Sequence, residues 1–187
     1  MQTPHKLCGI DEAGRGPIAG ALVVAGCILH SKIDGLNDSK KLSEKRRETL
    51  FEQIIYNSTY HIVRFDAPSI DALGISKCLK SALEQIMEAL EAERFLFDGS
   101  STFGASGLET MIKADASVAE VSAASILAKV TRDREMITLD ATYPQYGFAE
   151  HKGYGTALHV ERIKRHGYCD IHRRSFRLKA LEPTLFD

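Results

Sequence analysis

Apolar side chains follow two kinds of pattern, one typical of strands and one typical of helices, which take turns along this chain. Short runs rich in Val, Ile and Leu predict strands at residues 6–10, 21–29, 60–65, 94–97 and 110–114. Apolar residues at helical spacing predict helices at residues 43–56, 76–93, 117–139 and 156–166. Because strands interleaved with helices are typical of α/β proteins, we expect an α/β fold.

The predicted helices carry recognisable end signals. Ser43 can cap the first helix, and Ser117 with Glu120 has the S-x-x-E spacing of a capping box. Gly167 is expected to end the last helix. Since no linker or repeat divides the chain, residues 1–180 are expected to form one domain, followed by a tail of residues 181–187.

The charge of the chain is uneven along its length. The 187 residues have a formal net charge of -1, so there is no overall basic excess to attract a polyanion. Residues 151–187, however, carry eight Lys or Arg against four Asp or Glu. Any attraction for phosphate is therefore expected to come from local clusters, mainly near this end.

Cysteine usage and hydropathy indicate the compartment. Four cysteines lie far apart, without a C-x-x-C pair, and are predicted to be reduced packing thiols: Cys8, Cys27, Cys78 and Cys169. The first seven residues contain no apolar signal-peptide run, and no 18-residue apolar stretch occurs. We expect a cytoplasmic location and no membrane association.

Four carboxylates stand at the ends of predicted elements. Asp11 and Glu12 follow the first strand, Asp98 ends a later one, and Asp115 comes just before a helix. In open α/β sheets, ligands bind beyond the carboxyl ends of strands, where acids from separate strands can converge. A site of oxygen ligands suits Mg²⁺ or Mn²⁺ better than zinc.

Each acid alone also has a simple structural explanation. Asp98-Gly99 is a common turn, and Asp115 could assist the start of a helix. Adjacent strand residues point to opposite faces, so Asp11 and Glu12 can share a site only if the strand twists or ends between them. The glycines that follow them make this possible.

Several blocks of residues resemble, in the same order, the ribonuclease HII family. The first is Asp11–Gly20, which reads DEAGRGPIAG. The others are Leu36–Leu42, Asp98–Gly99, Ser122–Asp133, His151–Thr156 and Ile171–Phe176. The resemblance covers about residues 6 to 177, and the ordered set is far more specific than any one block.

The resemblance implies a ribonuclease H-like fold, with a central mixed sheet flanked by helices and a helical C-terminal segment. It implies an endonuclease that hydrolyses the RNA strand of RNA/DNA hybrids and cuts 5′ of ribonucleotides embedded in duplex DNA. Asp11, Glu12, Asp98 and Asp115 match the family's four catalytic acids. They would bind two Mg²⁺ or Mn²⁺ ions, and cleavage would leave a 3′-hydroxyl and a 5′-phosphate.

The resemblance also assigns substrate contacts. Gly14, Arg15 and Gly16 match the segment that contacts the ribose 2′-hydroxyl at the RNA-to-DNA junction, and Tyr154 matches the aromatic residue that completes it. Glycines let the main chain approach a sugar closely, and the 2′-hydroxyl distinguishes RNA from DNA. Without the ordered blocks, a simple turn and a half-buried tyrosine would be the preferred interpretations. Predicted phosphate contacts are Ser39, Lys40, Lys129, His172, Arg173 and Arg174.

Two other functions need to be weighed. A nucleotide-binding protein could use Gly14–Gly20 to hold a phosphate, but the spacing G-x-G-x-x-x-G differs from G-x-G-x-x-G, and no P-loop sequence is present. A non-catalytic module that binds hybrids would be expected to lack at least one acid, yet all four are present.

The tail ends in two large apolar residues, Leu185 and Phe186. It resembles the short Leu-Phe peptides with which bacterial replication and repair proteins bind the sliding clamp, although Glu182 replaces the usual Gln and Pro183 is atypical. The alternative is that both side chains fold back onto the core.

Overall fold

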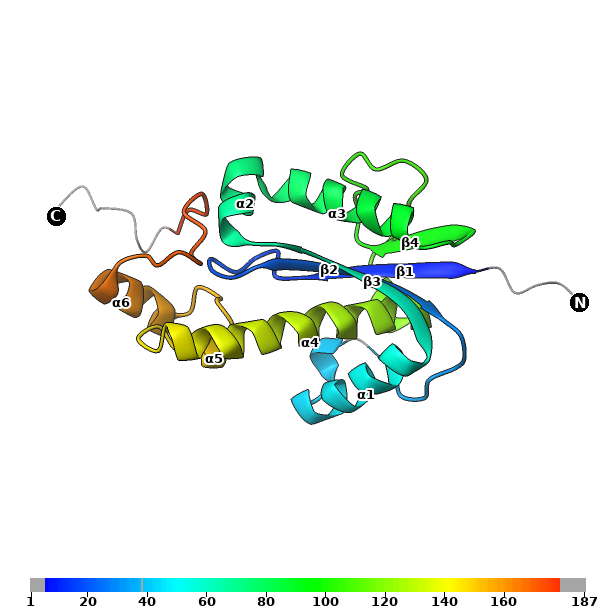
Figure 1. Cartoon of the computed structure of the whole chain (residues 1–187), viewed down its shortest axis with the longest axis horizontal. Coiled ribbons are helices and arrows are strands. Elements are labelled where there is room, and N and C mark those ends of the chain that lie inside the picture. Colours follow the sequence, from blue (N-terminus) through cyan, green and yellow to red (C-terminus); the bar gives the residue numbers. More distant parts are fainter. Residues whose placement is uncertain (1–5, 38, 179–187) are drawn as a thin grey trace, which may run out of the picture.

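The computed structural model describes residues 6–37 and 39–178 and contains a five-stranded mixed sheet (Figure 1). The strand order is β3-β2-β1-β4-β5. β1 pairs antiparallel with β2 and parallel with β4, β2–β3 is antiparallel, and β4–β5 is parallel. The strands are β1 (Leu7–Ala13), β2 (Leu22–Leu29), β3 (Ser58–Phe65), β4 (Arg94–Asp98) and β5 (Glu109–Met111). The expected α/β fold with a central mixed sheet is confirmed.

Helices cover both faces of this sheet (Figure 1). One face packs against α2 (Ala67–Leu73) and α3 (Ile75–Ala89), and the other against α1 (Glu44–Tyr56) and α4 (Ala119–Thr142). Beyond one end of the sheet lie α5 (Phe148–His151) and α6 (Ala157–His166). Two short 3-10 turns are η1 (Ser39–Lys41) and η2 (Ala114–Ala116). No helix in the described part of the chain is long and apolar enough to cross a bilayer.

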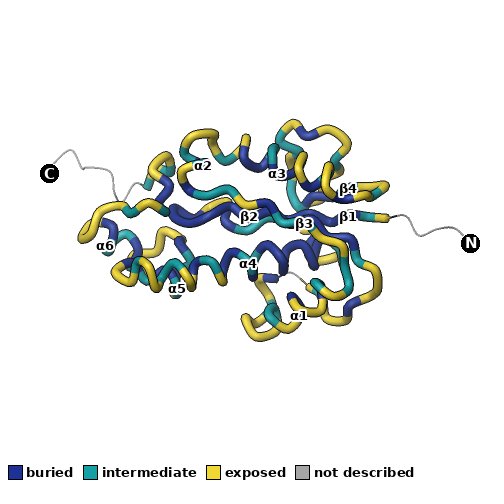
Figure 2. Tube along the Cα trace, in the orientation of Figure 1, coloured by how far each residue is buried: buried dark blue, intermediate teal, exposed yellow. Residues whose placement is uncertain are grey.

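The core has one layer on each side of the sheet, and burial is deepest along β1, β2 and α4 (Figure 2). Alternate strand residues separate the layers, so Ile10 and Val24 pack against α3, whereas Val23 and Ala25 face α1 and α4. Leu83 of α3 is fully buried. Burial of a leucine of this kind contributes about 1.5–3 kcal/mol to folding.

Small side chains bring α4 unusually close to the sheet. A Cβ atom at Gly9 of β1 would lie 2.2 Å from the backbone of Glu120 and Val121, so only glycine fits there. The helix contributes Ala123, Ala124 and other small residues to this contact. Close packing here accompanies the placement of Ser125 of α4 beside Asp11 of β1.

Several predicted boundaries were correct. Ser43 caps α1 and accepts a hydrogen bond from the Arg46 N–H at 3.2 Å. α6 ends at His166, and Gly167 follows with a φ of 75°, a conformation that favours glycine.

Other predicted elements were wrong. The capping box does not form, because Val118 is the N-cap of α4 and makes no side-chain cap hydrogen bond. The predicted helix at 76–93 is shorter, and α2 precedes it, capped by Asp66. The strand predicted at 110–114 ends at Met111, and Lys113 turns the chain with a φ of 60°. Asp115 therefore lies in η2 rather than at the end of a strand.

Candidate active site

Three carboxylates from separate elements meet at one edge of the sheet. Asp11 belongs to β1, Asp98 ends β4 and Asp115 lies in η2. One carboxylate oxygen from each lies within 4.8 Å of the others. The parallel pairing of β1 with β4 places Ile10 beside Phe97, which brings the residues that follow them to the same edge. Asp98 Oδ1 also accepts the Ala114 N–H at 3.2 Å, which ties η2 to β4.

Burial makes Asp11 and Glu12 costly to ionise. Burial, together with the charges of Glu12 and Asp98, raises the pKa of Asp11 well above its usual value. Burial raises the pKa of Glu12 to about 7, although Arg15 opposes the shift. A cation among these oxygens would favour their charged forms. The donor set therefore fits a divalent metal ion that prefers oxygen ligands.

Glu12 lies beside the three-acid cluster rather than within it, as expected for a residue adjacent to Asp11 on a strand. Its Oε2 atom is buried and lacks a hydrogen-bond partner among the described residues. Arg15 Nη1 lies 3.9 Å from the other carboxylate oxygen, Oε1. A buried, unpartnered carboxylate oxygen beside other acids is a suitable ligand for a cation.

A cavity of about 260 Å³ opens beside Asp11 and Glu12. Most of the predicted substrate-binding residues line it, although they come from distant parts of the sequence: Gly14, Arg15, Gly16, Ser39, Lys40, Lys129 and Tyr154. An adjoining cavity is lined by Asp98 and Asp115, and Lys40 borders both. The two cavities together form a site with acids in the middle and basic residues around them.

The predicted phosphate contacts differ in accessibility. Lys40 is exposed at the rim, whereas Lys129 is half-buried and forms an ion pair with Asp133 at 2.8 Å. Ser39 is only 2% exposed, and its hydroxyl is 2.8 Å from that of Ser125. Ser39 therefore forms part of the cavity wall, whereas Lys40 and Lys129 bring positively charged side chains to the cavity.

The structure corrects the predicted roles of His172 and Arg173. They are 2% and 1% exposed, so neither can contact a phosphate directly. Arg173 instead donates hydrogen bonds to the carbonyls of Gly14 at 2.6 Å, Arg15 at 3.4 Å and Gly20 at 2.9 Å. Its guanidinium therefore holds the Gly14–Gly20 loop from behind. Arg174 is exposed, and its backbone N–H donates to Asp71.

A second buried arginine supports the same loop. Arg132 of α4 is 1% exposed and donates to the carbonyls of Ala21 at 2.9 Å and Ala19 at 3.0 Å. Burial and the like charge of Arg132 lower the pKa of Arg173 to about 9, which still leaves it protonated at neutral pH. The two guanidiniums satisfy backbone carbonyls that a strand partner would otherwise satisfy.

The glycines of the loop have different reasons to be glycine. Gly14 has a φ of 93°, and a Cβ atom there would lie 2.3 Å from Arg132, so packing accounts for it. A Cβ atom at Gly16 would meet no protein atom within 4 Å. Because Gly16 is exposed and lines the cavity, the missing side chain leaves room on the side from which a ligand would approach.

Three residues near the site, Ser125, Arg132 and His159, have no role that the sequence predicts. Ser125 contacts the Asp11 carboxylate and lowers its pKa, which partly offsets the effect of burial. The only sequence signal at Ser125 is the run of small residues Ser122–Ser125, which by itself predicts close helix packing and no contact with an acid. Nothing local in the sequence indicates that Arg132 and His159 contact the backbone of the loop and of Tyr154.

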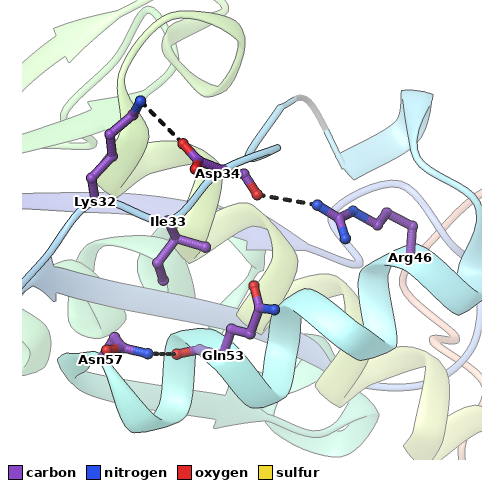
Figure 3. Close-up of a pocket in the computed structure, with 6 residues that line it drawn as sticks. All are labelled: Lys32, Ile33, Asp34, Arg46, Gln53 and Asn57. Carbon is purple, nitrogen blue, oxygen red and sulfur yellow. Dashed lines mark hydrogen bonds and ion pairs between the residues drawn. The ribbon is translucent and has the colours of Figure 1, made fainter.

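A larger cavity, of about 500 Å³, lies away from these acids beside α1 (Figure 3). Several of its polar groups are already paired with one another. Lys32 forms an ion pair with Asp34 at 3.0 Å, Arg46 donates to the Asp34 carbonyl, and Asn57 donates to the Gln53 carbonyl. Volume alone does not identify a site, and this cavity offers no convergent chemistry.

Comparisons with known proteins agree with the geometry. The family model described as Ribonuclease HII matches residues 8–179. A curated protein named Ribonuclease HII from Sulfurovum sp. (strain NBC37-1) is 62% identical, with 100% of both chains covered. Among solved structures, a similar one is ribonuclease HII in the PCNA:RNase HII complex from Archaeoglobus fulgidus, with a TM-score of 0.80. It is 30% identical in sequence, and the match covers 97% of this chain and 98% of that one. Ribonuclease H2 from Pyrococcus horikoshii OT3 gives 0.74 at 30% identity, covering 91% and 93%.

Proposed function

Because the chain belongs to the ribonuclease HII family, whose members are endonucleases that cut the RNA strand of RNA/DNA hybrids, we propose that it also cuts 5′ of single ribonucleotides embedded in duplex DNA. The main observation behind this proposal is that the acids and the predicted ribose-contacting residues border the same cavity. The cluster of Asp11, Asp98 and Asp115 adjoins a cavity that the Gly14–Gly16 segment and Tyr154 also line. Residues 1–180 would act as one catalytic domain.

Asp11, Glu12, Asp98 and Asp115 would hold two divalent cations, Mg²⁺ or Mn²⁺. Bound there, the ions would supply an activated water and neutralise charge on the leaving oxygen, giving a 3′-hydroxyl and a 5′-phosphate. The protein would contribute four carboxylates, held close together at a site that is partly shielded from solvent. The pKa values of Asp11 and Glu12, raised by burial, support this assignment, because metal binding would offset the cost of their ionisation.

The Gly14–Gly16 segment and Tyr154 would read the ribose at the RNA-to-DNA junction. Tyr154 is 47% exposed although it lines the cavity, which leaves its ring and hydroxyl accessible to a sugar. The open space beside Gly16 supports a close approach of the backbone. Lys40 and Lys129 would contact phosphates and hold the duplex without reading its sequence.

The direct test uses a DNA duplex that contains one ribonucleotide, incubated with the protein in Mg²⁺ or Mn²⁺. We expect one cut on the 5′ side of the ribonucleotide, and none when a chelator is present in excess over the metal. An all-DNA duplex of the same sequence is the control. Binding without any cut in either metal would instead favour the non-catalytic alternative.

The C-terminal tail would bind the sliding clamp through Leu185 and Phe186, which lie outside the described residues. Support comes from the similar archaeal enzyme that was solved in complex with PCNA. Deleting residues 182–187 is expected to abolish clamp binding while leaving the melting temperature and the cleavage of a short duplex unchanged. A clear drop in melting temperature, or no clamp binding by the intact chain, would identify the tail as packing only.

A further inference from the structure

Three buried histidines lie directly behind Tyr154. His151 ends α5, His159 lies in α6, and His172 lies in the segment that follows α6. They are 8%, 0% and 2% exposed, and the rings of His151 and His159 stack with their centroids 4.1 Å apart. Buried imidazoles are costly unless every ring nitrogen finds a partner, so their hydrogen bonds determine which tautomers can exist.

One chain of hydrogen bonds runs through His172 and His159 to Tyr154. His172 Nδ1 accepts the Cys169 N–H at 2.9 Å, so a neutral His172 carries its proton on Nε2. His172 Nε2 lies 3.0 Å from His159 Nε2, which must therefore accept this N–H. His159 then carries its own proton on Nδ1 and donates it to the Tyr154 carbonyl at 2.9 Å. Both ring nitrogens of His159 and both of His172 are therefore paired, and the tautomer of each ring is fixed.

His151 holds the residue before Tyr154. Its Nδ1 accepts the Gly153 N–H at 3.2 Å, and its Nε2 donates to the Tyr146 carbonyl at 2.9 Å. The Gly153 carbonyl in turn accepts the N–H groups of Ile18 and Ala19. The histidines therefore fix the backbone that carries Tyr154, and the same backbone is joined to the Gly14–Gly20 loop.

We propose that His159, supported by His172 and His151, is a positioning residue that sets the place of Tyr154 against the ribose at the RNA-to-DNA junction. This rests on the proposed function, because it takes Tyr154 as the residue that contacts the ribose. The hydrogen bond from His159 fixes the carbonyl of Tyr154, and the Arg132 guanidinium lies 5.8 Å from the centroid of its ring. Pre-organisation of this kind raises the rate at a given substrate without a direct contact.

The surroundings keep the three rings neutral. Burial lowers the pKa of His151, and it lowers the pKa of His159 and of His172 to about 4. A second proton on either ring of the His159–His172 pair would place two N–H groups face to face. The other titratable groups around the rings are Asp140, Tyr146, Glu150, Arg162, Tyr168, Cys169 and Arg174. The hydrogen-bond chain is thus complete at neutral pH.

The test compares His159→Asn with His159→Leu on a duplex that contains one ribonucleotide. The Asn amide can donate near the former Nδ1 position, whereas Leu fills space but cannot donate. His159→Leu is expected to lower kcat/KM about tenfold, within the range that misplacement of a positioning group produces. His159→Asn is expected to stay within about threefold, because it keeps the hydrogen bond to Tyr154. A purely structural histidine would give the opposite order, since buried Leu is tolerated better than buried Asn.

The same substitutions on a Tyr154→Ala background separate positioning from general damage. If His159 acts through Tyr154, His159→Leu should change cleavage by less than about twofold once the tyrosine ring is absent. Circular dichroism and melting temperature establish that each variant is folded. If His159→Leu does not fold, the comparison moves to His172, where Gln can donate near the Nε2 position and Leu cannot.

The outcomes distinguish this inference from the proposed function. If Tyr154→Ala alone leaves cleavage unchanged, the role of Tyr154 in the proposed function is wrong, and this inference fails with it. If Tyr154→Ala lowers cleavage but His159→Leu costs as much on that background as in the parent, only the positioning role is wrong. An Asn variant that is no better than Leu overturns it as well.

Discussion

Asp98→Asn is expected to lower the rate of cleavage by about a thousandfold, the scale on which a single charged group acts in an active site. The amide keeps the size of the side chain and an oxygen that can accept the Ala114 N–H. It removes one negative charge from the cluster with Asp11 and Asp115. Single-turnover cleavage of an RNA/DNA hybrid measures the loss, and Asp11→Asn should behave in the same way.

Binding should survive the same substitution. In metal-free buffer the affinity of Asp98→Asn for the hybrid is expected to match the parent, because the lysines and not the acids attract phosphate. Mg²⁺ or Mn²⁺ should raise the melting temperature of the parent and affect the variant less. Asp34→Asn is the matched control, since Asp34 is exposed and lines the other cavity. Near-normal turnover by Asp98→Asn would remove the basis for the metal site.

The convergence of Asp11, Asp98 and Asp115 could be predicted because it depends largely on local signals. Asp98 ends β4, whereas Asp11 lies inside β1, which continues to Ala13 instead of ending at residue 10 as predicted. Parallel pairing of these two strands still brings the two acids to the same edge of the sheet. Asp115 was also predicted to join them, but for a partly wrong reason. The chain reaches the site through a turn at Lys113 and a 3-10 turn, and no propensity in the sequence indicates that turn.

The roles of His172 and Arg173 could not be predicted from residue type. Basic residues in a basic region are usually exposed, and phosphate contact was a reasonable interpretation of the type. Burial here depends on pairing across the chain: Arg173 and the Gly20 carbonyl are 153 residues apart in sequence. Ala19 and His172 form an isolated bridge that brings the two segments together. Such contacts arise only when the loop and the C-terminal segment have already packed.

The error at the start of α4 has a similar origin. Ser117 and Glu120 have the right spacing for a capping box, but the Ser117 N–H donates to the Ala114 carbonyl within the turn that carries Asp115. The Ser122 hydroxyl also donates to the Asp115 carbonyl. The turn that places Asp115 at the site therefore prevents the capping box from forming. Conflicts of this kind between local preference and structure are common near functional sites.

Arg173→Met is expected to lower the free energy of unfolding by about 2–4 kcal/mol. It leaves buried carbonyls without donors, and each such carbonyl costs about 1–3 kcal/mol. Removal of the buried charge of Arg173 offsets part of this cost. The carbonyls belong to Gly14, Arg15 and Gly20. For a chain of this size, the expected drop in melting temperature is roughly 5–15 °C. Arg173→Lys should also be destabilising, since an ammonium group cannot reproduce the planar fork of donors.

Arg174→Met is the matched control, because it removes the same charge from the next residue, which is exposed. It should change stability by less than about 0.5 kcal/mol. Salt titrations of hybrid binding then distinguish the two roles. Loss of a phosphate contact would lower the slope of log affinity against log salt by about one, with little effect on stability. Arg173→Met should instead lower stability and leave the salt slope unchanged. An unchanged melting temperature together with a reduced salt slope would show that Arg173 is a phosphate ligand after all.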